Sequence, residues 1–174
     1  MLSFKRNGAP FLRNGCADFA EYAGMIMFTE FSSDNKEKHK KKINNIIEQK
    51  GLCSIMNNTK WKELKKGINE LPFLPPFVIK SVDEEETSYH RFEKDAYNTN
   101  DWGMYSDDYL GGDIYATPFY AVEWIKIRPR LLKHQGCLIE SKVIDETDEF
   151  LAMLKKYNIP FEKKNETYII YGYH

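Results

Sequence analysis

The feature that most constrains the fold is a stretch of alternating character at residues 119–130. Read with a period of two, one side of an extended strand carries Ala121, Glu123, Ile125 and Ile127, and the other carries Tyr120, Val122, Trp124, Lys126, Arg128 and Arg130. Both sides are apolar at first, which predicts an interior strand. The second side then becomes a row of three cations, just where Pro129, which lacks an N–H, would stop the pairing.

Two helices are predicted around this strand. The first should begin at an N-cap, Thr59, and end before Pro72. It repeats apolar residues at helical spacing (Trp61, Leu64, Ile68 and Leu71), with Lys62, Lys65 and Lys66 off that stripe. The second should be capped by Asp145 and has an acidic first turn (Glu146, Asp148 and Glu149) and a basic last turn (Lys155 and Lys156), which matches the helix macrodipole.

Further strands complete the sheet. Residues 77–82 are β-prone, and residues 160–173 predict a hairpin that turns near Asn165. Residues 131–145 are interpreted as a connecting segment. The predicted fold class is α+β, with a largely antiparallel four-stranded sheet and two helices packed on one of its faces.

The first 55 residues are patterned more weakly than the rest. A short helix is predicted at residues 17–31, and a capping box at Asp34 and Glu37 predicts a second one that ends at Gly51. A compact set of elements begins directly after Met56. We therefore predict an N-terminal helical appendage or extension at residues 1–55 and an α+β domain at residues 56–174.

A long acidic loop is predicted at residues 83–113. It holds ten acidic residues against Arg91 and Lys94 alone, together with the aromatic residues Trp102 and Tyr105. A connection of this length exceeds the usual one, which favours a functional loop. The same charge makes a nucleic-acid partner unexpected, because the loop would repel a polyanion.

Composition bounds the surroundings of the protein. Its three cysteines lie far apart in the sequence, which favours free thiols and a reducing compartment. No segment is long and apolar enough for a membrane helix, and the apolar run at residues 23–28 is too short for a signal sequence. We expect a cytoplasmic protein without a membrane partner.

Several groups of residues are of types that could carry chemistry. Asp107, Asp108 and Asp113 are hard oxygen ligands, but their spacing is not that of a known calcium loop, so solvated turn carboxylates are favoured over a metal site. His134 and Cys137 lie near the basic row, but a separation of three residues permits a nucleophilic pair without specifying one. No catalytic residue, metal site or cofactor is predicted.

The charged residues of the central strand allow two interpretations. Glu123 is expected to be partly buried and to form an ion pair with a basic side chain, with a general acid as the alternative. Lys126, Arg128 and Arg130 could bind phosphate, with Trp124 as a stacking surface. Pairing of this basic row with acids of the 83–113 loop is the favoured interpretation.

The chain also resembles a bacterial family of small uncharacterised proteins over residues 56–174. The resemblance rests on residues 121–130 and on shorter motifs at residues 57–61, 71–73, 143–145, 159–161 and 170–173. It implies a family without implying an activity.

The expected function is that of a small cytosolic protein-binding module. It would be an immunity-type or antitoxin-type protein whose acidic, aromatic loop binds a partner with a basic surface. The candidate binding residues are Trp102, Tyr105, Asp107, Asp108, Asp113, Trp124, Arg128 and Arg130. The alternative is a phosphate- or nucleotide-ligand module, or an enzyme, built on Glu123, Arg128, Arg130 and His134.

Overall fold

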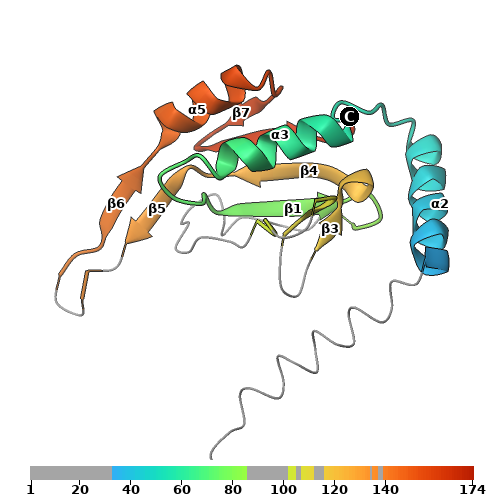
Figure 1. The fold of residues 1–174 in the computed structure, drawn as a ribbon, viewed down its shortest axis with the longest axis horizontal. Coiled ribbons are helices and arrows are strands. Elements are labelled where there is room, and N and C mark those ends of the chain that lie inside the picture. The colour runs from blue at the N-terminus through green and yellow to red at the C-terminus, as the bar shows by residue number, and fades with distance from the viewer. Residues whose placement is uncertain (1–32, 86–101, 105–106, 112–115, 134, 137–138) are drawn as a thin grey trace, which may run out of the picture.

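The computed structural model describes residues 33–85, 102–104, 107–111, 116–133, 135–136 and 139–174. Its helices are α2 (Ser33–Lys50), α3 (Asn58–Ile68) and α5 (Thr147–Lys156), with a short 3₁₀ helix, η1 (Phe119–Ala121) (Figure 1). Its strands are β1 (Phe77–Ser81), β2 (Tyr109–Leu110), β3 (Thr117–Pro118), β4 (Val122–Ile127), β5 (Arg130–Lys133), β6 (Lys142–Asp145), β7 (Glu162–Lys164) and β8 (Thr167–Tyr171).

Four of these strands form the main sheet, in the order β1-β4-β8-β7. Every neighbouring pair in it is antiparallel. The predicted mixed α+β fold with a four-stranded antiparallel sheet is therefore confirmed, and β4 is the interior strand that its alternation predicted. The predicted C-terminal hairpin is β7–β8, with Asn165 at a φ of 55° in its turn.

The alternation of β4 is interrupted at its start. Residues 119–121 form η1 instead of strand, and the register with β1 shifts between Lys80 and Ser81. A shift of this kind turns side chains of both parities to one face. Val122 therefore joins Ile125 and Ile127 in the core, so the predicted division of residues 119–123 between two faces was wrong.

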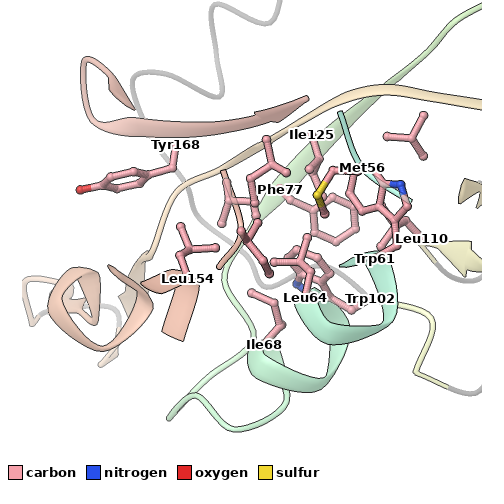
Figure 2. Packing of buried hydrophobic residues seen from close by; sticks show 14 of the residues in the cluster. Met56, Trp61, Leu64, Ile68, Phe77, Trp102, Leu110, Ile125, Leu154 and Tyr168 are labelled. Carbon is pink, nitrogen blue, oxygen red and sulfur yellow. The ribbon is translucent and has the colours of Figure 1, made fainter. Parts of the chain in front are cut away.

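The main core unites this sheet with two helices. Trp61, Leu64 and Ile68 of α3 and Phe150, Met153 and Leu154 of α5 belong to one buried cluster with Phe77, Ile125, Ile127, Tyr168 and Ile170 of the sheet. Figure 2 shows several of these side chains converging between the helices and the strands. The stripe that predicted α3 is thus its buried side. The N-cap of α3 is Asn57, not Thr59, because Asn57 Oδ1 accepts a hydrogen bond from Lys60 N at 2.9 Å.

A second, smaller core joins α2 to the sheet. Ile43 of α2 is buried against Val82 and Ala121, and Gly51, at a φ of 65°, follows the end of the helix as predicted. Cys53 and His174 exchange backbone hydrogen bonds of 2.8 and 2.9 Å beyond the end of β8. Residues before Met56 thus contact the following segment, and the domain boundary at residue 56 stays a prediction.

Two small sheets were not predicted. β2 pairs with β3, and β5 pairs with β6 in a hairpin that lies at the opposite end of the molecule from α2 (Figure 1). The sequence interpretation treated residues 131–145 as a connection. The strands have only four residues each and are joined by residues 134–141 without a two-residue turn, so the usual hairpin signal is missing.

Candidate functional site

Two of the described acids of the 83–113 loop pair with helix lysines. Asp83 lies 2.9 Å from Lys42 Nζ of α2, and Asp108 lies 3.3 Å from Lys62 Nζ of α3. Burial alone would raise the pKa of Asp83, but hydrogen bonds from Lys42 and Ser81 lower it overall. These acids therefore tie the ends of the loop to α2 and α3.

Trp102 is a core residue and not a surface contact. Its side chain is fully buried, its Nε1 donates to Pro75 O at 2.9 Å, and its ring centre lies 4.4 Å from that of Phe77. A partner at the surface could not reach it in this structure, so it leaves the set of candidate binding residues. Tyr105 and Asp113 lie outside the described residues, as do His134 and Cys137. Asp107 is exposed.

Lys65 holds the segment next to Trp102 in place, which the sequence did not reveal. Its ammonium group is buried and donates to the backbone oxygens of Gly103 at 2.6 Å and Tyr109 at 2.9 Å. Sequence periodicity placed it, like Lys62 and Lys66, off the apolar stripe of α3. Only the packing of the 102–111 segment over the helix buries it, so no local pattern could have identified it.

Glu123 forms the ion pair that was expected. Its carboxylate accepts a hydrogen bond from Lys80 Nζ at 2.5 Å and lies 3.7 Å from Lys50 Nζ. Arg128 is five residues further along the chain, roughly 16 Å at the rise of a strand. Glu123 and Arg130 therefore contact different side chains. The described residues of the alternative site, which was predicted at Glu123, Arg128, Arg130 and His134, do not come together.

Arg130 does not pair with the described acids of the 83–113 loop. Its Nε lies 3.3 Å from Asp145 Oδ2, and its Nη1 lies 3.5 Å from Glu166 Oε2. These contacts link β5 to the end of β6 and to the turn of the β7–β8 hairpin. The prediction that the basic row anchors the loop is wrong for Arg130, because the unpredicted β5–β6 pairing draws it away from β4.

An acidic concavity lies beside this contact. It has a volume of about 430 Å³ and is lined by Asp145, Thr147, Asp148, Glu149, Lys163, Glu166 and Tyr168. The residues come from the start of α5 and from the β7–β8 hairpin, which the sheet and Arg130 hold together. Four carboxylates thus face one ammonium group across a space large enough for a side chain.

The carboxylates of the acidic concavity differ in their environments. Burial alone would raise the pKa of Asp145, but hydrogen bonds from Thr147 and the charge of Arg130 lower it overall. Asp148 and Glu149 are exposed and have no ion-pair partner among the described residues. They are the charges that an incoming cation would meet first.

An aromatic side chain completes the lining. The ring of Tyr168 packs against Phe150 and Phe161, with ring centres 5.5 and 5.7 Å apart, and Lys163 Nζ lies 5.8 Å from its centre. The hydroxyl end of Tyr168 points away from the other labelled core residues (Figure 2). The site could not be predicted from the sequence, where the acids of the first turn of α5 match the helix dipole and nothing links them to Glu166.

Glu146 lies directly behind the acidic concavity and is buried. It is only 2% exposed; its Oε2 accepts from Phe73 N at 3.3 Å, and its Oε1 has no hydrogen-bond partner among the described residues. Burial raises the pKa of Glu146 from 4.5 to about 7, against the hydrogen bond from Phe73, and the charges of Glu149 and Asp145 add to the rise. The sequence predicts a charged Glu146 that interacts favourably with the dipole of α5. In the structure, its side chain is instead buried.

The described part of the chain contains no group of three or more His, Cys, Asp or Glu side chains arranged to hold a metal ion. In the same residues, no helix combines the length and the apolar character that a membrane span requires. The acidic concavity, with its four carboxylates, is the candidate binding site.

Fold and site together define a small α+β protein with an acidic concavity between a helix N-terminus and a hairpin. The chain belongs to the family of unknown function DUF6678, whose model matches residues 43–174. The match begins at residue 43, inside α2, and not at residue 56, where the resemblance noted in the sequence began. No curated protein and no solved structure matches the chain significantly.

Proposed function

We propose that the protein is a small binding module that takes a basic segment of a partner protein. The observation that carries the proposal is the acidic concavity, in which four carboxylates surround a space of about 430 Å³. Complementary charge steers such partners together and fixes their orientation. Asp148 and Glu149 supply the accessible negative charge, and Arg130 keeps Asp145 and Glu166 in place.

The proposal moves the binding surface away from the 83–113 loop. Asp83 and Asp108 of that loop already pair with Lys42 and Lys62. An arginine or lysine side chain that enters the acidic concavity would instead meet carboxylates and the edge of Tyr168. Lys163, the lysine in the lining, would repel a cationic group on its side of the acidic concavity. A bound peptide should therefore place its basic residues on the side of Asp148 and Glu149.

The role that we propose for this binding module is that of an immunity-type or antitoxin-type protein. An immunity-type or antitoxin-type protein of the bacterial cytoplasm neutralises a partner by covering its basic surface, and it needs no catalytic group. A compact sheet that presents fixed carboxylates suits that task, because little conformational entropy is lost on binding.

Neutralising the two accessible carboxylates should weaken binding of a short arginine-rich peptide. The double variant Asp148→Asn, Glu149→Gln is expected to lower the affinity by about 5- to 30-fold at low salt, because each exposed ion pair contributes about 0.5–1 kcal/mol. Fluorescence anisotropy of the labelled peptide, titrated with the full chain at low and moderate salt, measures the change.

The matched control is Glu48→Gln, Glu85→Gln, which removes the same charge from exposed positions away from the acidic concavity. It should leave the affinity nearly unchanged. Equal weakening by both double variants would mean that only net charge matters and would refute the site. Thermal unfolding of each variant excludes loss of the fold, since acids in the first turn of a helix stabilise it by about 0.3–1 kcal/mol each.

A further inference from the structure

One face of the main sheet points away from the helices. Residues directly opposite each other in antiparallel strands share a face, and faces alternate along each strand. The rows Phe77–Ile127–Tyr168 and Ile79–Ile125–Ile170 face the core shared with α3 and α5. The two alternate rows, Val78–Lys126–Ile169 and Lys80–Trp124–Tyr171, therefore form the outer face. Lys80 and Ile169 are buried there, and the other four residues are half-buried.

Aromatic rings occupy one end of this outer face. Trp124 of β4 lies directly opposite Tyr171 of β8, and both are half-buried, so part of each ring reaches the surface. The ring of His174 continues the row, with its centre 5.0 Å from that of Tyr171. Tyr171 is oriented by its hydroxyl, which donates to Glu162 at 2.9 Å.

Cations follow these rings along β4. Lys126 Nζ lies 4.8 Å from the centre of the Trp124 ring. Arg128 follows, with its backbone N donating to Pro76 O at 3.0 Å, but it is buried and only 8% exposed. Within β4, the aromatic rings are thus followed by the ammonium group of Lys126.

This order matches the chemistry of a nucleotide. Bases stack on aromatic side chains largely regardless of sequence, and lysine and arginine neutralise the adjoining phosphate. We propose that Trp124, Tyr171 and Lys126 form a binding site for a nucleotide unit, either free or within a single strand. The base stacks on the two rings, and Lys126 meets the phosphate.

In the sequence, the negative charge of the 83–113 loop makes a nucleic-acid partner unexpected. In the structure, two of its acids, Asp83 and Asp108, are paired with lysines, which reduces that repulsion. The site shares no residue with the acidic concavity, so the two proposals stand or fall separately.

The test uses the full chain and two probes, a mononucleotide and a labelled uridine oligonucleotide. Binding should quench tryptophan fluorescence, because Trp61 and Trp102 are buried and Trp124 is the one that reaches the surface. Tyr171→Leu should weaken the oligonucleotide about tenfold or more, whereas Tyr171→Phe, which keeps the ring, should not. Lys126→Gln should lower the slope of affinity against salt by about one.

Phe161→Ala is the matched control, because Phe161 is an exposed aromatic residue that packs on Tyr168 of the core face. It should leave binding unchanged. Binding of the mononucleotide supports a free ligand, and binding of the oligonucleotide alone supports a single strand. Absence of saturable binding of both probes to folded protein, or equal affinity of the wild type and Tyr171→Leu, would overturn the proposal.

Discussion

Replacing Glu146 with glutamine should make the stability of the protein nearly independent of pH between about pH 4.5 and 8. In the wild type, we expect the free energy of unfolding to fall over this range. The folded protein holds the proton of Glu146 with a pKa of about 7, whereas the ordinary value is 4.5. The unfolded chain therefore binds fewer protons between these values, so the free energy of unfolding falls as the pH rises through them and levels off above about pH 8. The loss is about 3 kcal/mol in the wild type, because each pKa unit of the shift corresponds to about 1.4 kcal/mol. Urea unfolding across this range measures it.

Glu48→Gln, at an exposed position of α2, is the control for the removal of a carboxylate. It should keep the pH dependence of the wild type. A Glu146→Gln variant that loses as much stability with rising pH as the wild type would show that this carboxylate is ionised without cost in the folded protein, and the account of its burial would be wrong.

Replacing Gly103 with alanine should destabilise the protein strongly. Gly103 has a φ of 61°, and a Cβ built on it would lie 2.1 Å from Gly111 O. The backbone cannot easily shift, because Lys65 holds the Gly103 carbonyl and Trp102 is buried next to it. We expect a loss of about 3 kcal/mol or more, from the left-handed backbone conformation and the contact together.

Gly51→Ala separates these two contributions. Gly51 has a similar φ of 65°, but a Cβ there would meet nothing within 4 Å. Its loss should be about 1 kcal/mol, the cost of the left-handed conformation alone. Equal losses in the two variants, measured by thermal or urea unfolding, would contradict the close approach of the 103 and 111 segments.

Local patterns predicted the main sheet well. The alternation of residues 122–127, the breaks at Pro72 and Pro129 and the turn near Asn165 are properties of neighbouring residues, so β4, α3 and the β7–β8 hairpin followed from them. The shift at Lys80 and Ser81 did not, because a β-bulge depends on how two strands meet. Glu123 therefore forms the predicted kind of ion pair, with Lys80, although the face predicted for it from simple alternation was wrong.

The candidate site depended on contacts between distant segments. Trp102 lies in a segment without apolar periodicity, and Lys65 lies off the apolar stripe of α3. Their burial depends on the packing of the segments around Gly103 and Tyr109 against that helix. Glu166 comes from a hairpin turn and Glu149 from a helix, and no spacing in the sequence joins them. Composition predicts an acidic binding surface in the 83–113 loop, whereas the site that we propose lies between α5 and the β7–β8 hairpin.

The most direct test of the account is to locate the arginine-rich peptide on the protein by NMR. Titration of the isotope-labelled full chain should shift the backbone amide signals of residues 145–149 and 163–168 together, with saturation at one affinity. The first amides of α5 are especially sensitive, because they lack partners within the helix. Saturable shifts in these two segments are the predicted result. Shifts confined to other segments, with residues 145–149 and 163–168 unchanged, would contradict the acidic concavity as the binding site.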